Sequence, residues 1–280
     1  MQTATSTYTF GSKRYDLTSR THIMGILNVT PDSFSDGGQY HDVDAAVARG
    51  VEMAEEGADF IDIGGESTRP GSDPLSLDEE LKRVLPVIER LAKATDVPLS
   101  IDTYKASVAE RALNAGAVIV NDISGLHFDD RLADVTAEHH ASIVLMHIQG
   151  TPKTMQENPH YDNRIEEICE YLAQGIRRAR GAGIEQIIVD QGIGFGKTLT
   201  HNLEIIRRLG EFQRLGCPLL VGPSRKSFIG RILDLPVDQR IEGTAAAVTA
   251  SIMNGANIIR VHDVKEMKRI AQVADAILRS

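Results

Sequence analysis

The chain has 280 residues and a formal net charge of −9 at pH 7, which argues against a general nucleic-acid surface, because such a surface needs a dense basic stripe. No apolar run approaches the roughly 20 residues of a membrane span, and the first residues lack the apolar core of a signal peptide. The two cysteines, Cys169 and Cys217, lie far apart and match no disulfide or zinc pattern. We therefore expect a cytoplasmic protein that binds neither nucleic acid nor membranes.

The first predicted element is a β-hairpin over residues 7–17, where large and polar side chains alternate around Gly11. After it, a strand and then a helix recur along the chain. Strands are predicted near residues 23–27, 60–63, 99–101, 118–120, 143–146, 187–189, 218–221 and 258–261. Amphipathic helical patterns cover residues 80–94, 164–182 and 264–278. Ser76 and Glu79 form a capping box ahead of the first pattern, and Pro86 inside it should kink the helix or cost stability.

Eight strands that alternate with eight helices predict an α/β fold, the (β/α)8 TIM barrel, with the hairpin as an N-terminal plug. A doubly wound open sheet is the alternative, but it usually carries Gly-x-Gly-x-x-Gly after its first strand. That motif is missing there. No Pro/Ser-rich linker or break in composition divides the chain. We therefore predict one domain over residues 1–280, with the hairpin at about 7–17 and the barrel at about 22–280.

Nearly every predicted strand ends in a polar side chain, at the face where barrels of this type carry their active sites. A lone aspartate after a strand is usually a helix cap. A ring of buried polar groups is costly unless a ligand pairs with it, so the ring points to a binding site. The residues at these ends are Asn28, Asp62, Asp102, Asn121, His147, Asp190, Arg260 and His262, together with loop segments 64–71, 192–197 and 224–227.

These side chains sort into two chemical groups. The first offers acceptors and an amide for a flat heterocycle that carries N–H groups, and comprises Asp102, Asn121 and Asp190. The second suits an anion such as diphosphate with a bridging metal, and comprises Arg260, His262, Asn28 and Arg69. Lys226 can contact either ligand. The segment Gly194-x-Gly196-Lys197-Thr198 is not a P-loop, because Walker A needs glycine where Gln191 stands.

Seven segments, in the right order along almost the whole chain, resemble the motifs of dihydropteroate synthases. They are GILNVTPDSFSDGG (25–38), DIGGESTRPG (62–71), NDISG (121–125), QGTPKTM (149–155), GIGFGK (192–197), SRKSF (224–228) and RVHDV (260–264). The chain departs from the family pattern at Gln191, where proline usually follows the aspartate, and at Ile148, where methionine usually follows the histidine. Both are backbone or packing positions.

The resemblance implies a transferase of folate biosynthesis that condenses 6-hydroxymethyl-7,8-dihydropterin diphosphate with p-aminobenzoate, giving 7,8-dihydropteroate and diphosphate. It implies Mg²⁺ at Asn28, a homodimer formed through late helices, and sulfonamide sensitivity. The implied contacts to pterin diphosphate are Thr68, Asp102, Asn121, Asp190, Lys226, Arg260 and His262. The implied contacts to p-aminobenzoate are Phe34, Thr68, Pro70, Phe195 and Ser227. Catalytic roles fall to Asp36, Arg69, Lys226, Arg260 and His262, with Asp36 and Arg69 ordering loops over the intermediate.

In this family diphosphate is understood to leave first, and the neutral aromatic amine then attacks the pterin-stabilised cation. No strong base is required, which agrees with the absence of a Ser-His-Asp or paired-glutamate arrangement in the sequence. One alternative is a pterin-binding methyltransferase. Such an enzyme would lack the combination of segments 34–36 and 224–227, and it would also lack the diphosphate-binding residues. The other is a non-catalytic paralogue of the same fold, which should have lost loop or anion residues that this chain retains.

Overall fold

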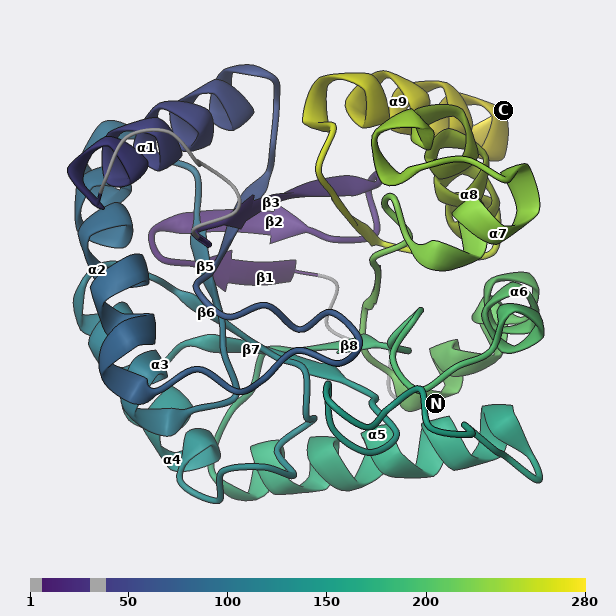
Figure 1. The fold of residues 1–280 in the computed structure, drawn as a ribbon, viewed down its shortest axis with the longest axis horizontal. Coiled ribbons are helices and arrows are strands. Elements are labelled where there is room, and N and C mark those ends of the chain that lie inside the picture. Colours follow the sequence, from purple (N-terminus) through teal and green to yellow (C-terminus); the bar gives the residue numbers. More distant parts are fainter. Residues whose placement is uncertain (1–6, 31–38) are drawn as a thin grey trace.

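The barrel of this chain is closed by eight parallel strands. The computed structural model describes residues 7–30 and 39–280, and the strand order is β10-β3-β4-β5-β6-β7-β8-β9. Figure 1 shows the helices as an outer ring around these strands. A separate antiparallel pair, β1 (Thr7–Phe10) and β2 (Lys13–Asp16), precedes the barrel. The predicted (β/α)8 fold and its N-terminal hairpin are confirmed.

The predicted strands agree closely with the observed ones. The barrel strands are β3 (His22–Asn28), β4 (Phe60–Gly64), β5 (Leu99–Asp102), β6 (Ile119–Asp122), β7 (Ser142–Met146), β8 (Ile187–Asp190), β9 (Leu219–Val221) and β10 (Ile258–Val261). The α-helices are α1 (Gln39–Glu55), α2 (Leu77–Ala94), α3 (Ala106–Asn114), α4 (Leu132–Glu138), α5 (Arg164–Gly181), α6 (Leu199–Arg207), α7 (Ser227–Leu233), α8 (Ile241–Met253) and α9 (Val264–Arg279). The expectation of one helix after each strand fails after β9, where the 3-10 turn η3 (Val237–Gln239) joins α7 to α8.

Helix α2 begins at the capping residue that the sequence predicts. Ser76 is the N-cap, and its hydroxyl accepts a hydrogen bond from the backbone N–H of Glu79 at 3.4 Å, so this half of the predicted capping box is confirmed. The apolar face, which includes Val84 and Leu91, is buried against the barrel. The helix runs through Pro86 without interruption to Ala94, so Pro86 does not end it.

The hairpin closes the amino end of the barrel. Phe10 is 1% exposed and meets the ring of Phe60 edge-on, with ring centroids 4.9 Å apart. The two rings belong to one buried apolar cluster, the floor cluster, which takes a residue from every barrel strand except β5. Its members are Tyr8, Phe10, Leu17, Met24, Phe60, Ile119, Val144, Ile188, Leu220 and Ile258. The hairpin therefore acts as the predicted plug.

The floor cluster determines which side chains lie above it inside the barrel. Side chains of a strand alternate between its two faces, so residues two positions apart point the same way. On each strand that contributes to this cluster, the residue two positions after the floor-cluster residue lies at the next level of the barrel interior. These residues are Ile26, Asp62, Asn121, Met146, Asp190, Gly222 and Arg260, and β5 adds Asp102 to the same level. We call these eight residues the polar layer. Most of them are polar or charged, so the barrel changes from apolar to polar within one pleat.

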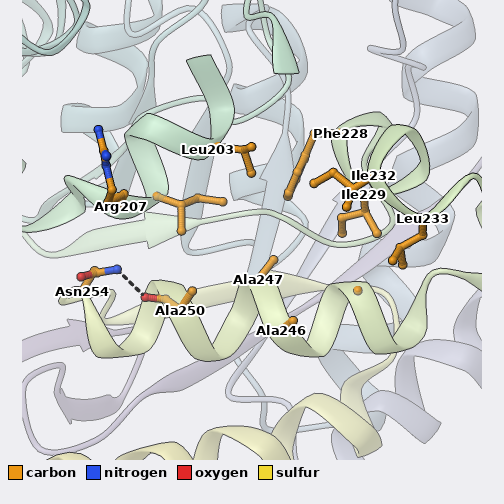
Figure 2. Close-up of a pocket in the computed structure, with 12 residues that line it drawn as sticks. Leu203, Arg207, Phe228, Ile229, Ile232, Leu233, Ala246, Ala247, Ala250 and Asn254 are labelled. Carbon is orange, nitrogen blue, oxygen red and sulfur yellow. Dashed lines mark hydrogen bonds between the residues drawn. The ribbon is translucent and has the colours of Figure 1, made fainter. Parts of the chain in front are cut away.

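An apolar groove lies outside the barrel, between α6, α7 and α8. Its volume is about 470 Å³, and Figure 2 shows Ala246, Ala247 and Ala250 of α8 facing the larger side chains of α6 and α7. Among those larger side chains, Leu203, Ile232 and Leu233 are 44%, 54% and 42% exposed. The small residues of α8 therefore make one smooth wall of a groove that still exposes large apolar groups.

None of the helices within residues 7–30 and 39–280 combines the length and apolar character needed to cross a bilayer.

The plug makes a testable contribution to stability. We expect Phe10→Ala to lower the free energy of unfolding by about 3–5 kcal/mol, because it empties the centre of the floor cluster. Urea denaturation of the two proteins measures the difference. Lys13→Ala on the same hairpin is the control, since Lys13 is exposed and its loss should cost no more than about 0.5 kcal/mol. Equal unfolding curves for Phe10→Ala and the parent protein would show that the barrel end is closed without the hairpin.

Candidate active site

A cavity of about 590 Å³ opens above the polar layer, at the carboxyl ends of the barrel strands. It brings together ten of the residues singled out in the sequence: Asn28, Thr68, Arg69, Pro70, Asp102, Phe195, Lys226, Ser227, Arg260 and His262. Asn121 and Asp190 are each 5% exposed and belong to the polar layer beneath. Phe34 and Asp36 lie outside the described residues. The predicted site residues from strands far apart in sequence thus converge on one cavity.

Arg260 reaches across the barrel interior to two carboxylates. Its Nε donates to Asp62 Oδ2 at 2.6 Å, and its Nη2 donates to Asp102 Oδ2 at 2.7 Å. The same Asp62 oxygen accepts from Asn121 Nδ2 at 2.8 Å. Asp62 is fully buried, and in the described part of the chain its Oδ1 has no partner. Asp62 therefore orients two predicted site residues at once, a role that the sequence analysis did not assign to it.

Burial dominates the electrostatics of this layer. It raises the pKa of Asp102 to about 7, against the opposing effect of the Arg260 guanidinium. Burial also raises the pKa of Asp190, although Lys226 nearby opposes the rise. The pKa of Lys226 falls to about 8 for the same reason. Each of these groups is therefore poorly solvated and depends on partners of opposite charge.

Lys226 and Asp190 border the loop that follows β8. Asp190 Oδ1 accepts from the backbone N–H of Gly192 at 2.7 Å. Lys226 Nζ donates to the carbonyl of Ile193 and lies 4.7 Å from the centroid of the Phe195 ring, a cation–π distance. The ring itself is partly buried and packs against an apolar cluster that includes Met155. The loop thus presents one aromatic face to the cavity beside a buried ammonium group.

A second, buried lysine holds the same loop from behind. Lys197 is 3% exposed, and its Nζ lies 2.8 Å from His147 Nδ1 and donates to the Phe195 carbonyl at 2.8 Å. Gly192 has a φ of +68°, and a Cβ there would lie 1.9 Å from the His147 carbonyl oxygen, so only glycine fits. His147, noted at a strand end in the sequence, therefore supports the loop and does not line the cavity.

The loop after β4 is anchored at its base, and beyond Pro70 it is joined to the loop after β7 by a hydrogen bond from Gly71 N–H to the Pro152 carbonyl at 3.1 Å and by the Asp73–Lys153 ion pair. Glu66 accepts from Tyr104 OH at 2.8 Å and forms an ion pair with Lys105. Lys105 also donates to the carbonyl of Leu75 at 2.7 Å, which closes the base of the loop. Between these two points, Thr68 is partly buried, whereas Arg69 and Pro70 are exposed. This ion-pair network was not foreseen, since Glu66 and Lys105 carry no signal in the sequence that links them.

Two cross-links join the loops after β9 and β10. Ser224 Oγ lies 2.9 Å from His262 Nδ1 and accepts from the His262 backbone N–H at 3.2 Å. Next to this pair, Arg225 Nε donates to Asp263 Oδ2 at 3.0 Å, and the pair has a second ion-pair contact. Burial, together with the positive Arg260 and Arg225, lowers the pKa of His262 to about 4. The imidazole is therefore neutral at physiological pH.

The donors present fit Mg²⁺ only in company with an anionic ligand. Asn28 ends β3 and contributes an amide oxygen at the cavity wall. Across residues 7–30 and 39–280, no three His, Cys, Asp or Glu side chains cluster to hold an ion by themselves. Mg²⁺ is commonly held by one or two protein oxygens plus substrate phosphates and waters. Asn28 lines the same cavity as Arg260 and His262, and the chemistry of this donor set is compatible with that pattern.

The comparisons with known proteins agree on one family. Residues 24–262 match the family model described as pterin binding enzyme. A dihydropteroate synthase of Synechocystis sp. is 50% identical over 272 residues, which is 96% of this chain and 94% of that protein. The Yersinia pestis dihydropteroate synthase with a sulfonamide drug complex superposes with a TM-score of 0.92 at 44% identity, covering 98% of this chain and all of that one. The Xanthomonas albilineans dihydropteroate synthase with 4-aminobenzoic acid superposes with a TM-score of 0.92 at 41% identity, covering 98% of this chain and 99% of that one.

Proposed function

The chain belongs to the dihydropteroate synthase family of pterin-binding enzymes, and we propose on this premise that it condenses dihydropterin diphosphate with p-aminobenzoate. The reaction is an alkyl transfer of folate biosynthesis that releases 7,8-dihydropteroate and diphosphate. The observation that carries the proposal is the convergence of two chemically distinct residue groups on one cavity of about 590 Å³. The match to named synthases over 96% of the chain favours this function over a pterin-binding methyltransferase or a non-catalytic paralogue.

The pterin would bind in the polar layer. Asp190 has one oxygen bonded to Gly192 N and keeps acceptor capacity for the parallel N–H groups of the pterin edge. Asn121 donates to Asp62 through Nδ2, which leaves its carbonyl oxygen to accept from a ligand. Asp102 now accepts from Arg260, so the pterin must share or replace that contact. Three acceptors held by the barrel support recognition of a heterocycle rich in N–H groups.

Diphosphate would lie over Arg260 and His262, with Mg²⁺ at Asn28 supplying further positive charge when bound. The C–O bond to diphosphate breaks first, and its electron pair leaves with the anion. Arg260 contributes a guanidinium charge and His262 a hydrogen-bond donor where negative charge accumulates, a form of electrostatic stabilisation that often dominates catalysis. The nitrogen lone pair of the neutral amine then attacks the cationic carbon left on the pterin, and the N–H proton released as the C–N bond forms passes to water or to the departing diphosphate.

p-Aminobenzoate would occupy the outer part of the cavity. Phe195, Pro70, Thr68 and Ser227 line it, while Phe34 and Asp36 are assigned from the sequence alone. Lys226 beside the Phe195 ring lies between the pterin and amine ends. Arg69, exposed on the loop after β4, is assigned to ordering that loop over the reacting groups. The solved Xanthomonas relative contains 4-aminobenzoic acid, which supports an amine site of this kind.

We further propose that the chain works in the cytoplasm as a homodimer of single-domain subunits. The groove between α6, α7 and α8 supports the dimer, because it exposes Leu203, Ile232 and Leu233 next to the smooth wall of α8 shown in Figure 2. Burying this face in a symmetric, self-complementary interface would remove these apolar groups from water.

The pterin assignment predicts the effect of Asp190→Asn. This change places N–H donors against N–H donors of the pterin, so we expect binding to weaken by at least about 2–3 kcal/mol. Isothermal titration calorimetry with pterin diphosphate measures this loss of affinity. Asp162→Asn is the matched control, because that carboxylate is 97% exposed and outside the cavity. Unchanged affinity of the Asp190 variant for pterin diphosphate would remove Asp190 from the site.

The dimer proposal predicts that a charge in the groove separates the subunits. In sedimentation at micromolar concentration, the parent protein should run as a dimer and Ile232→Glu as a monomer, since burying an unpaired carboxylate is costly. Ile277→Glu is the control, because Ile277 is equally large and 61% exposed on α9, away from the groove. A parent protein that sediments only as a monomer would refute the dimer.

Binding order can be tested with a sulfonamide in place of p-aminobenzoate. The acceptors for pterin are fixed in the barrel, whereas Thr68 and Pro70 lie on a surface loop whose contacts beyond its base, Gly71 to Pro152 and Asp73 to Lys153, are made to another loop, so we expect the amine site to be completed by the pterin and anion. Calorimetric titration of the drug should show affinity higher by about tenfold or more once diphosphate, Mg²⁺ and pterin are present. p-Aminobenzoate should compete in the same titration. Equal affinity with and without these ligands would mean that the pocket is preformed.

A further inference from the structure

Ser224 is placed to control the hydrogen-bonding state of His262. We propose that Ser224 is a positioning residue, which keeps His262 in the neutral tautomer that carries its proton on Nε2. In this state His262 donates a hydrogen bond from Nε2–H to the departing anion, in a direction fixed by the ring, and transfers no proton to it. The identity of that anion as diphosphate rests on the proposed function, but the tautomer follows from contacts within the protein.

The hydrogens of this pair can be assigned one by one. A serine hydroxyl has one hydrogen to donate and two lone pairs to accept with. The backbone N–H of His262 can only donate, so the 3.2 Å contact places Ser224 Oγ as its acceptor. Ser224 is 4% exposed, and among residues 7–30 and 39–280 its remaining side-chain contact is the one of 2.9 Å to His262 Nδ1. The hydroxyl hydrogen therefore goes to Nδ1, which must be the unprotonated nitrogen.

The charged form of His262 does not fit the same contacts. An imidazolium carries a hydrogen on both ring nitrogens, so Nδ1–H would take the second lone pair of Ser224 Oγ and the hydroxyl hydrogen would lose Nδ1 as its acceptor. That hydrogen would then have no acceptor among residues 7–30 and 39–280, and leaving a buried donor unsatisfied costs about 1–3 kcal/mol. Arg260, Arg225 and Lys226 add positive charge nearby, with Asp263 as the opposing group. Contacts and charges both favour the neutral ring with its proton on Nε2.

Ser224 is held in place by its own loop. The next residue, Arg225, has a φ of +56°, a left-handed conformation that is uncommon outside glycine. Its backbone N–H donates to Thr244 Oγ1 at 3.0 Å, and its carbonyl accepts from Arg240 Nη1 at 3.0 Å. The Arg225 side chain pairs with Asp263. Residues 224 and 225 are thus each bonded to the residue opposite, 262 and 263, so that the hydroxyl is aimed at the ring.

The tautomer determines what His262 offers to the cavity. His262 lines the same cavity as Arg260 and Asn28, and Nδ1 is occupied by Ser224, so Nε2–H is the ring group left for a ligand. A neutral imidazole N–H donates a hydrogen bond but does not readily release its proton. The electron pair of the breaking C–O bond therefore goes to a diphosphate oxygen without proton transfer from His262. In this proposal Arg260 supplies a fixed positive charge, and His262 supplies a hydrogen bond whose direction is fixed.

Nitrogen NMR on histidine-labelled protein reads the tautomer directly. In long-range ¹H–¹⁵N spectra of the full chain, the signals missing from His262→Gln identify His262, and we expect an unprotonated Nδ1 and a protonated Nε2. Ser224→Ala should shift both nitrogens toward the average of the two tautomers, whereas Ser224→Thr keeps the hydroxyl and should keep the parent pattern. A protonated Nδ1 in the parent protein, or unchanged signals in Ser224→Ala, would overturn the inference.

Steady-state kinetics separates positioning from general damage to the fold. We expect Ser224→Ala to lower kcat/KM for pterin diphosphate by about tenfold or more, as loss of an orienting partner does elsewhere, with KM for p-aminobenzoate unchanged. Ser224→Thr should restore most of the loss. An equal effect on both substrates, or none, contradicts a positioning role. If the parent protein shows the Nε2–H tautomer but does not condense the two substrates, the proposed function fails and the tautomer assignment stands.

Discussion

The site depends on the pairing of charges that the strand alternation forces into the barrel interior. Asp62, Asp102 and Asp190 share one level with Arg260, and Lys226 reaches in from the loop after β9. Buried charges are costly unless they are paired with good geometry. In the structure, Arg260 satisfies two of the three carboxylates, so a ligand that enters must exchange partners with it. We therefore expect the layer to favour a heterocycle with N–H groups, because an apolar ligand could not replace the hydrogen bonds that its entry breaks.

The loops around this layer are not equally constrained. Buried cross-links hold two of them, Lys197 beneath Phe195 and Ser224 against His262. The loop after β4 has its ion pair at Glu66 and exposes Arg69 and Pro70. On the proposed assignment, the pterin and anion ends would be preorganised by buried contacts, while the amine end would include the loop after β4, whose contacts to the loop after β7 lie at the surface. Such a division suits a reaction in which the anion must leave before the amine attacks.

Much of this arrangement could be predicted from the sequence, and the failures have physical reasons. Apolar runs located the strands, since buried parallel strands are apolar on both faces, and the motifs located the cavity residues. The role of Asp62 was missed because its partners Asn121 and Arg260 come from strands that are not its neighbours in the sheet. Helix α7 was missed because its seven residues after β9 are too few to show a separate periodic pattern. Pro86 leaves α2 continuous, a result of packing that local propensity does not show.

A neutral donor at the anion end also has a consequence for turnover. The diphosphate group is already anionic in the bound substrate and gains a further negative charge as the C–O bond breaks, so the charge of Arg260 would attract the group throughout and also stabilise the charge that develops. A hydrogen bond with a fixed direction depends on the position of the oxygen that accepts it, and can therefore strengthen as the C–O bond breaks. Arg260 is already shared with Asp62 and Asp102, which moderates its hold on the product. On the proposed assignment, attraction by charge would fall to Arg260 of β10, and discrimination by hydrogen-bond direction to His262 of the loop that follows it.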